Sequence, residues 1–449
     1  MTVESKVGSA RKAMAEIGDY TQEQVDNLVY AAAKIIYDNA ELLAEEAVAE
    51  TRLGKVAHKI DKNKDTAAVF YDYLKDKRSV GVINEIPEQG LIEVAHPVGV
   101  VAAVIPATNP IITTTGNFLH AVKGKNAIIV TPAPRAEKCI THTIELIRAA
   151  LAREGAPADL IQVLESPTFE MTGELMKACD LVLATGGWGL TKAAYSSGTP
   201  AYGVGPGNAP VILDRDFDIA AAARLSLDSK RSDNGILCDD EEILFYPAET
   251  EKELFGALRD IGVVVYEDEA DVDKIRQTVF PDGHVDANIL GKDAPVLAAA
   301  AGLSVPDATE LIAVKVVKCG AEDILNDEIM GPVLKLKSYQ TFEEAVDMAV
   351  GYLMNSGIGH TAGIFSNNRD HIVYAGERIP VSRLLVNQPS TYAWGPITNG
   401  LAPAVSEGCG TWAGNILAGN VDYVHLLNIS KIAFPLDIEA PTGEQIFAR

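Results

Sequence analysis

The sequence predicts an α/β protein whose first half is a doubly wound, largely parallel sheet, and three observations lead to this prediction. Apolar runs typical of buried strands alternate with helical patterns between residues 98 and 213, and such a chain crosses over right-handed between parallel strands. Hydrophobic residues make up 47% and charged residues 22% of the chain, as in ordinary globular proteins. The length of 449 residues exceeds what one hydrophobic core serves, so two or three domains are expected.

The N-terminal segment is predicted to be helical and to serve as scaffold. Apolar residues between positions 25 and 36 recur at helical spacing, and a second helical stretch covers residues 65–77. A strand over residues 98–105 follows, almost wholly apolar, as a strand covered on both faces would be. A polar turn that contains Asn109 comes next, ahead of a helix over residues 111–122. Strand, turn and helix in this order are where open α/β sheets bind ligands.

The alternation continues with further strands and their connecting helices. The triplet Thr185-Gly186-Gly187 ends one strand and precedes a helix, so its backbone could approach a diphosphate or a nicotinamide at the helix N-terminus. Taken alone, the triplet is more typical of a plain turn, and no GxGxxG fingerprint follows the first strand. A second glycine-rich turn at residues 202–210 leads into a strand over residues 211–213. The other predicted strands are residues 125–131, 161–164 and 181–184, and the helices are residues 137–154, 169–178 and 190–197.

Cys238 stands in the segment Ser232–Glu242, which reads SDNGILCDDEE, after a predicted helix over residues 219–230. A thiol is intrinsically nucleophilic, so a site needs only to expose and orient it. The turn at Asn234 and Gly235 could aim the Cys238 sulfur and backbone N–H into one cleft, which would supply half of an oxyanion hole. An isolated cysteine between apolar residues is more often a packed side chain, so the assignment depends on the remaining motifs.

A second α/β unit follows, and the domain boundary is predicted near residue 233. Residues 1–232 are expected to form a nicotinamide cofactor-binding domain and residues 233–423 the catalytic domain. Residues 424–434 alternate apolar and polar side chains as a strand does, so the segment 424–449 is expected to return along the molecule and could pair across a subunit boundary. The strands predicted in the second unit are residues 242–246, 262–266, 311–317, 333–339, 361–366 and 383–387, with helices at 250–261, 269–279 and 342–353.

Composition excludes several classes of protein. The chain has 38 Lys and Arg against 62 Asp and Glu, a net charge of −24, so its average surface repels nucleic acid and anionic membranes. No apolar run reaches the roughly 20 residues of a membrane span, and the N-terminus lacks a signal-peptide apolar region, so we expect a cytoplasmic protein. The 5 cysteines contain no CxxC pair and the 8 histidines show no metal-ligand spacing, so neither a disulfide framework nor a bound metal is expected.

Seven groups of motifs are spread over nearly the whole chain: IPATNP (105–110), ATGG (184–187), KAAYSSG with AYGVGPGN (192–208), DNGILC (233–238), DEIMGPV (327–333), GIGHTAGI (357–364), and NQP (387–389) with GCGTW (408–412). In this order they resemble the aldehyde dehydrogenase superfamily, specifically its coenzyme A-acylating branch of bacterial acetaldehyde, succinate-semialdehyde and sulfoacetaldehyde dehydrogenases. The resemblance implies a Rossmann-like cofactor domain, an α/β catalytic domain, a short oligomerisation strand, and a homodimer or homotetramer.

The resemblance assigns a role to each matching residue. Cys238 is the nucleophile, and Asn109 is the other oxyanion donor, a kind of group whose loss typically costs about 2.7 to 4 kcal/mol in the barrier. Glu328 matches the glutamate that holds the nicotinamide ribose, since a carboxylate accepts hydrogen bonds from both hydroxyls. Outside the resemblance, Asn109 would be a turn residue before a proline and Glu328 a solvated charge. The residues that match the cofactor-binding segments are Thr131, Arg135, Thr185, Gly186, Gly187 and Gly205.

The mechanism that the resemblance implies is ping-pong. The Cys238 thiolate attacks the aldehyde, a hydride leaves for the nicotinamide, and a thioester remains on the sulfur. The choice between NAD and NADP stays open, since Arg135 could meet a 2′-phosphate or merely cap a strand end.

The acyl acceptor is expected to be coenzyme A. Hydrolysis of the thioester needs a general base, and Val204 stands where hydrolytic members carry a glutamate. No Asp or Glu occurs between Asp180 and Asp214, so the base is missing even if the alignment slips. A thiol is acidic enough to need less help than water. His360 could assist it as acid or base, or could be a packed histidine.

The chain departs from the resemblance near the cysteine. Relatives follow the cysteine with Ser or Ala, then Ser, Glu and Gln, whereas residues 239–242 here are Asp, Asp, Glu and Glu. Negative charge beside a thiolate would raise its pKa, although alternation along a strand would point some of these side chains away. Glu407 stands where relatives tend to be apolar, and it could restore a base or be a solvated glutamate.

The flanking sequence and three basic residues indicate the class of substrate. The flanking sequence is closest to the succinate-semialdehyde and sulfoacetaldehyde members, whose substrates carry an anionic tail, and arginine is the natural partner for such a tail. Arg231, Lys230 and Arg383 are candidates for that tail, for coenzyme A phosphates or for ion pairs. Residues 412–415 lack an arginine that resembling succinate-semialdehyde enzymes carry, and Ser232 replaces an aromatic residue, so the pocket is reshaped.

Three functions remain open on the sequence alone. The first is a coenzyme A-acylating aldehyde dehydrogenase for a small aldehyde, with sulfoacetaldehyde or succinic semialdehyde ahead of acetaldehyde. The second is a hydrolytic semialdehyde dehydrogenase. The third, from another class, is a non-catalytic protein that keeps the fold for filament or compartment assembly.

Overall fold

Four helices open the chain: α1 (Val3–Glu16), α2 (Gln22–Asp38), α3 (Ala40–Thr51) and α4 (Val56–Leu74). The structure is a computed structural model that describes residues 2–448. Thr21 caps α2 in a reciprocal capping box with Gln24, and α2 buries apolar residues at helical spacing. The helical N-terminus is therefore present as expected. Helix α1 is an addition that the apolar pattern does not predict, because its buried face includes a lysine and two alanines beside only two valines.

The first sheet has five parallel strands in the order β5-β4-β3-β6-β7. Every residue of β3 (Val100–Ile105) and β4 (Ala127–Pro132) is buried, as their apolar runs predict for central strands covered on both faces. The predicted doubly wound sheet is confirmed. Its strand order reverses between β3 and β6, and ligands of such sheets bind at this switch point. The remaining elements are β5 (Ile161–Val163), β6 (Leu181–Thr185), β7 (Ala201–Val204), α5 (Pro110–Lys123), α6 (Glu137–Arg153), α7 (Phe169–Ala178) and α8 (Trp188–Tyr195).

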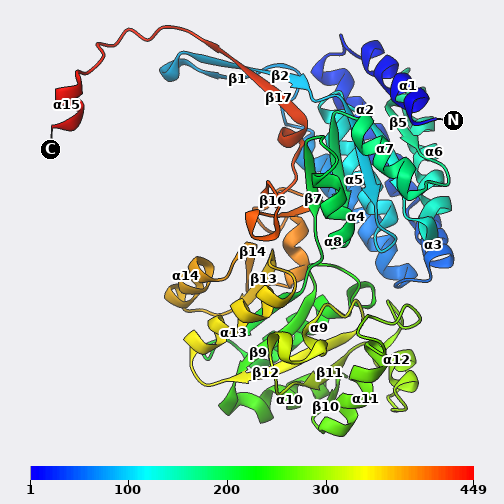
Figure 1. Cartoon of the computed structure of the whole chain (residues 1–449), viewed down its shortest axis with the longest axis vertical. Coiled ribbons are helices and arrows are strands. Elements are labelled where there is room, and N and C mark those ends of the chain that lie inside the picture. The colour runs from blue at the N-terminus through cyan, green and yellow to red at the C-terminus, as the bar shows by residue number, and fades with distance from the viewer. Residues whose placement is uncertain (1, 449) are drawn as a thin grey trace.

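The second sheet has seven parallel strands in the order β10-β11-β12-β9-β8-β13-β14, and it lies at the other end of the molecule in Figure 1. Strand β8 (Ala209–Leu213) pairs with β9 (Glu241–Pro247), so the chain changes sheets between Val204 and Ala209. The predicted boundary near residue 233 lies later in the chain, because β8 and α9 (Ile219–Lys230) continue the strand and helix alternation without a break. The other elements are β10 (Val264–Tyr266), β11 (Ile312–Lys315), β12 (Val333–Tyr339), β13 (Gly359–Phe365), β14 (Val381–Val386), α10 (Glu251–Asp260), α11 (Glu269–Val279), α12 (Ala294–Ala300), α13 (Phe342–Asn355) and α14 (Arg369–Arg378).

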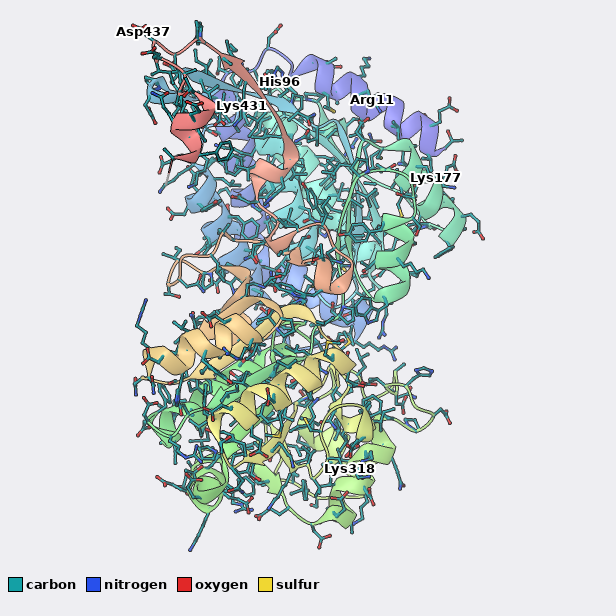
Figure 2. All side chains as sticks on the ribbon, turned by 60° about the vertical axis from the view of Figure 1, so that its left-hand side comes forward. Arg11, His96, Lys177, Lys318, Lys431 and Asp437 are labelled. Atoms are coloured by element: carbon teal, nitrogen blue, oxygen red, sulfur yellow. The ribbon has the colours of Figure 1, made fainter. Side chains whose placement is uncertain are left out.

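A third, antiparallel sheet has the strand order β1-β2-β17 and carries the C-terminus away from the body of the molecule (Figure 1). Its strands are β1 (Gly81–Ile86), β2 (Leu91–Pro97) and β17 (Leu427–Ala433). Figure 2 labels His96 on β2 and Lys431 on β17, and His96 Nε2 lies 3.0 Å from Ser430 Oγ across the pair. The expected C-terminal strand is therefore present, and it pairs within its own chain. Residues 434–448, with the short helix α15 (Gly443–Phe447), form what we call the C-terminal arm.

Two short strands, β15 (Glu407–Cys409) and β16 (Ala418–Asn420), pair with each other between the two parallel sheets. The sequence predicts neither, nor β1, α12 and α14, because short elements with few apolar residues carry no periodic signal. Strand β7 also lies partly inside the stretch 202–210 that reads as a glycine-rich turn. Among residues 2–448, no helix is long and apolar enough to cross a membrane.

Candidate active site

Cys238 lies in the loop between η4 (Ser232–Asn234) and β9. The residues Asp233, Asn234 and Gly235 have positive φ angles of 49°, 61° and 65°, so the expected turn is present just before the cysteine. Gly207 allows a close approach on the other side, because a Cβ atom there would lie 1.5 Å from the Cys238 carbonyl oxygen. The backbone of Cys238 is therefore held against the glycine-rich turn that follows β7.

A cavity of about 750 Å³ opens at Cys238, within the size range of cofactor and substrate sites. Its walls come from both parallel sheets. Asn109, which follows β3, and Thr185, which ends β6, line it from the switch point of the first sheet. Cys238 and Glu328 line it from the second unit. The structure thus brings the predicted nucleophile and the predicted oxyanion donor to one cavity.

A lysine that the motifs do not include orients Asn109. Lys62 on α4 donates a hydrogen bond of 2.6 Å to Asn109 Oδ1, which leaves the NH₂ group as the end that can donate to a negative oxygen. Lys62 and Lys59 also pair with the buried Asp233, with Lys59 Nζ at 2.7 Å. Burial alone would raise the pKa of Asp233, but the two lysines lower it to about 2. Asn109 and Asp233 lie in motifs, whereas Lys59 and Lys62 lie in none, and only their three-residue spacing on a helix places both on one face.

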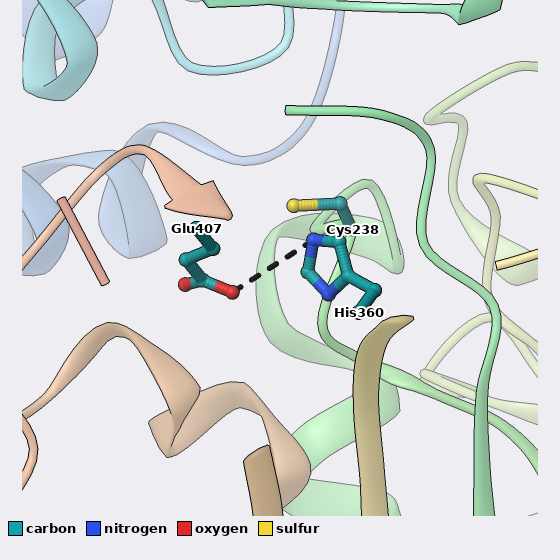
Figure 3. A group of neighbouring side chains, drawn as sticks. All are labelled: Cys238, His360 and Glu407. Atoms are coloured by element: carbon teal, nitrogen blue, oxygen red, sulfur yellow. Dashed lines mark ion pairs between the residues drawn. The ribbon is translucent and has the colours of Figure 1, made fainter. Parts of the chain in front are cut away.

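His360 and Glu407 lie beside the cysteine sulfur (Figure 3). Cys238 Sγ, a ring nitrogen of His360 and a carboxylate oxygen of Glu407 are all within 4.8 Å of one another. His360 Nε2 is 3.8 Å from Glu407 Oε2, and His360 Nδ1 is 2.9 Å from Thr361 Oγ1. Glu407 lines the cavity, whereas His360 is fully buried behind it. These residues come from distant parts of the chain, so their spacing in the sequence gives no sign of the cluster.

Burial and nearby acidic groups disfavour the thiolate form of Cys238. Burial raises the pKa of the Cys238 thiol well above its ordinary value, and the carboxylates of Glu407, Asp239 and Glu328 add to the effect. Burial also raises the pKa of Glu407. Burial and the nearby Arg383 guanidinium lower the pKa of His360, so the imidazole is neutral at pH 7. A proton acceptor close to the sulfur is therefore needed before the thiol can attack.

The acidic run that follows Cys238 is buried throughout and divides by strand alternation. Asp240 and Glu242 pair with Lys230, and Glu242 also pairs with Lys335 at 2.5 Å. Glu241 points elsewhere, and its carboxyl has no hydrogen-bond partner within residues 2–448. Asp239 lines the cavity. The expected alternation thus places only part of the negative charge beside the sulfur.

The residues that match cofactor-binding segments separate into two groups. Thr185, Gly186, Gly187, Gly205 and Glu328 line the cavity, with the glycines beside the N-terminus of α8. Two others do not line it.

Thr131 is buried at the end of β4, where its hydroxyl lies 3.1 Å from Thr172 Oγ1. Arg135 is exposed and donates to the Thr51 carbonyl oxygen at 2.7 Å. Thr131 lies in β4 and Arg135 follows that strand, and neither residue lines the cavity.

Of the three basic residues considered for an anionic tail, only Arg231 lines the cavity, and it pairs with Asp228 and Glu310. Lys230 is fully buried between Asp240 and Glu242. Arg383 is 3% exposed, and its guanidinium donates to the carbonyl oxygens of His360 and Gly408. Both buried side chains are committed to partners within the protein, so the structure does not bring them to the cavity.

Comparison with known proteins places this geometry in a family. Residues 1–260 and 315–400 match the model of the family described as aldehyde dehydrogenases. The chain belongs to the aldehyde dehydrogenase family. It is 44% identical over 448 residues to a succinate-semialdehyde dehydrogenase (acetylating) from Clostridium kluyveri, with 100% of this chain and 99% of that protein covered. The resemblance to acylating members that the motifs indicate is confirmed.

Solved structures agree with this assignment. An acetylating aldehyde dehydrogenase from Geobacillus thermoglucosidasius superposes with a TM-score of 0.94 at 36% identity, covering 98% of this chain and 97% of that chain. A propionaldehyde dehydrogenase from Rhodopseudomonas palustris, solved with bound coenzyme A and an acylated cysteine, gives a TM-score of 0.86 at 25% identity, with 96% and 97% covered.

Proposed function

We propose that this aldehyde dehydrogenase oxidises a small anionic aldehyde to its acyl-coenzyme A thioester through a covalent intermediate on Cys238. The observation that carries the proposal is the meeting of Cys238 and Asn109 at one cavity whose other walls are Thr185–Gly187 and Glu328. A nucleophile, an oxyanion donor and a glycine-rich helix N-terminus in one cavity are what covalent aldehyde oxidation requires.

Cys238 attacks the aldehyde carbonyl carbon, and the resulting oxyanion lies between the Asn109 side-chain amide and the Cys238 backbone N–H. Lys62 holds Asn109 Oδ1, so the amide presents its NH₂ group to the oxyanion. Departure of the hydride leaves a thioester on the sulfur, and attack by the coenzyme A thiol releases the product. Asn109 stabilises negative charge in both half-reactions.

The cavity fits a nicotinamide dinucleotide, NAD or NADP, which supplies the hydride acceptor. Gly187 begins α8 with open space where a Cβ atom would lie, so its backbone can approach a diphosphate. Burial raises the pKa of Glu328 to about 8, so this carboxyl can donate or accept a hydrogen bond with a ribose hydroxyl. Thr185 and Gly205 complete the same wall.

Coenzyme A as acyl acceptor is supported by the names of the relatives and by Val204. This residue stands where hydrolytic members carry their base, and its side chain is apolar and buried. Glu407 is the observation in favour of the alternative, a hydrolytic semialdehyde dehydrogenase, because it places a carboxylate beside the sulfur.

An anionic substrate is supported by the acetylating succinate-semialdehyde relative and by Arg231 at the cavity wall. Succinic semialdehyde and sulfoacetaldehyde share a short chain with an anionic end, which a guanidinium binds in preference to a neutral methyl group. We place the protein in the cytoplasm as a homodimer or homotetramer, with β17 and the exposed C-terminal arm as the segments that contact another copy.

The test is a panel of acetaldehyde, succinic semialdehyde and sulfoacetaldehyde with NAD⁺ or NADP⁺, with and without coenzyme A, and with products weighed by mass spectrometry. We expect acyl-coenzyme A as the product and a kcat/KM at least about 10³ higher for the anionic aldehydes. Free acid formed at an unchanged rate without coenzyme A would instead establish the hydrolytic enzyme. A protein that assembles but turns over none of the three aldehydes would be an assembly protein.

A further inference from the structure

Glu407, like His360, belongs to the cysteine cluster but has no role in the proposed mechanism. It begins β15, whose position is fixed by Arg383: the guanidinium donates to the Gly408 carbonyl oxygen and to Asn420 Oδ1 on β16, both at 3.1 Å. This arrangement points the Glu407 side chain to the cavity wall next to the sulfur (Figure 3). A solvated glutamate is thereby excluded, since the residue is only 5% exposed.

Two polar atoms of the cluster lack partners. His360 Nε2 and Glu407 Oε2 are buried without a hydrogen bond to any residue in the described part of the chain, although they lie only 3.8 Å apart. Buried polar atoms are normally hydrogen-bonded, because leaving one unpaired is costly. A ring nitrogen of His360 and a carboxylate oxygen of Glu407 lie within 4.8 Å of Cys238 Sγ, within reach of the sulfur directly or through one water. Such a pair is poised to receive a proton.

We propose that Glu407, with His360 as its neighbour, accepts the proton of the Cys238 thiol and later the proton of the coenzyme A thiol. This inference deepens the proposed function and depends on it. In the first half-reaction the Cys238 S–H bond breaks, its proton moves to Glu407, and the S–C bond to the aldehyde forms. That proton is then released to solvent, since the overall oxidation yields one proton.

In the second half-reaction the coenzyme A S–H bond breaks, its proton moves to Glu407, and a new S–C bond to the acyl group forms. The bond between Cys238 Sγ and the acyl carbon breaks, and the proton passes from Glu407 to the departing sulfur. The cluster thus ends in the protonation state in which it began. No oxidant beyond the nicotinamide of the proposed function is required.

Charge explains why a carboxylate suits this position. Moving a proton from Cys238 to Glu407 keeps one negative charge in the pocket, whereas loss of the proton to solvent would leave two negative charges side by side. The other titratable or charged groups at the cluster are Asp239 and Glu328 from the second unit and Arg383 from β14. Arg383 Nε lies 3.8 Å from Glu407 Oε2, and its positive charge opposes the rise that burial causes in the pKa of Glu407.

The test compares wild type with Glu407→Gln, which keeps the shape and removes the base, and with Glu249→Gln, an exposed carboxylate outside the cavity, as control. Two rates are measured against pH: alkylation of Cys238 by iodoacetamide, and steady-state formation of acyl-coenzyme A. For Glu407→Gln we expect alkylation to reach its plateau at lower pH, because a negative charge is gone, while turnover at pH 7 falls about 10²-fold or more.

These opposite changes separate a catalytic role from a structural one. A Glu407 that only packs or repels charge would give faster turnover, or no change, together with easier alkylation, and that result overturns the proposal. Glu407→Ala should recover part of the lost rate with added formate, while Glu249→Gln should behave as wild type. If Glu407→Gln loses only free-acid formation and makes acyl-coenzyme A at the wild-type rate, Glu407 activates water for hydrolysis of the thioester, and the inference is wrong. If the wild-type enzyme makes no acyl-coenzyme A, the proposed function is wrong, and this result is distinct from a failure of the inference about Glu407.

Discussion

At the scale of single residues, the site depends on which end of an amide faces the sulfur. Asn109 can serve as an oxyanion donor only if its NH₂ group points into the cavity, and the contact that decides this is the hydrogen bond from Lys62 Nζ to Asn109 Oδ1. The same ammonium group pairs with Asp233, which stands at the start of the turn leading to Cys238. Lys62 therefore acts as a positioning residue for both halves of the oxyanion hole.

Lys62→Met should lower kcat about 10- to 10²-fold with little change in KM, because the ground-state aldehyde does not need the oxyanion donor. Lys62→Arg should retain more activity, since a guanidinium can still donate to Asn109. Lys64→Met, an exposed lysine on the same helix, is the matched control. Stopped-flow NAD(P)H formation in the first turnover measures the effect. An unchanged first turnover in Lys62→Met would mean that Asn109 is oriented without it.

Sequence alone could identify Cys238 and Asn109, because each lies in a contiguous motif with a recognisable turn. It could not identify Lys62, whose contact depends on how α4 lies over the loop after β3. The sequence could not predict the role of Lys230 either. Its neighbours in the chain suggest a free cation, whereas the fold buries it between two carboxylates. Contacts between distant elements, rather than local propensity, decide these cases.

At the scale of one element, β9 carries a buried carboxyl without a partner. Glu241 is fully buried, and neither carboxyl oxygen makes a well-formed hydrogen bond within the described residues, although the Ser226 hydroxyl and the Ser390 backbone face it. Burial raises the pKa of Glu241 from 4.5 to about 8. The folded protein therefore binds a proton here that the unfolded chain releases, so stability present below pH 4.5 is lost as the pH rises towards 8.

Glu241→Gln should remove this contribution, because glutamine does not ionise. For this one carboxyl, the free energy of unfolding should fall by about 1.4 kcal/mol per pH unit between the unfolded and the folded pKa. Urea unfolding at pH 5 should differ between the variant and wild type by less than about 1 kcal/mol, whereas at pH 8.5 the variant should be more stable by roughly 4 to 5 kcal/mol. Glu253→Gln, which changes an exposed glutamate on α10, serves as the control. A variant no more stable than wild type at pH 8.5 would mean that Glu241 has a partner in solution.

Among the elements themselves, long apolar strands and amphipathic helices follow the sequence closely, as β3 and β12 illustrate. Strand β7 and the pair β15-β16 do not, since their residues are largely glycine and small side chains. These short strands nevertheless build the cavity wall that carries Glu407. Parts of the site thus lie where periodicity is weakest and tertiary pairing decides the structure.

At the scale of the whole molecule, the chain passes between its two sheets before β8, and no linker composition marks the place. Both units alternate strands and helices, so only the observed pairing of β8 with β9 and β13 distinguishes them. The C-terminal strand could be predicted from its alternation and β2 from its residues 91–95, but the pairing of the two strands could not. The C-terminal arm follows this strand.

The C-terminal arm presents apolar side chains to solvent in the isolated chain. Ile438 is 72% exposed and Phe447 is 84% exposed, and β17 is an edge strand whose outer side is unpaired within the described residues. Exposed apolar groups on an extended arm and an open strand edge are typical of subunit interfaces. We therefore expect the arm and β17 to pack on another copy of the chain.

Ile438→Asp combined with Phe447→Asp should shift the protein from a dimer or tetramer towards smaller species, because burying two carboxylates in an interface is costly. Multi-angle light scattering after gel filtration, at several protein concentrations, measures the mass. Met354→Asp, which changes an equally exposed apolar residue on α13, should leave the mass unchanged. The arm lies outside the cavity, so alkylation of Cys238 should keep its wild-type rate in the double variant. A wild-type protein that is monomeric at all concentrations, or a double variant with unaltered mass, would rule out the arm as the interface.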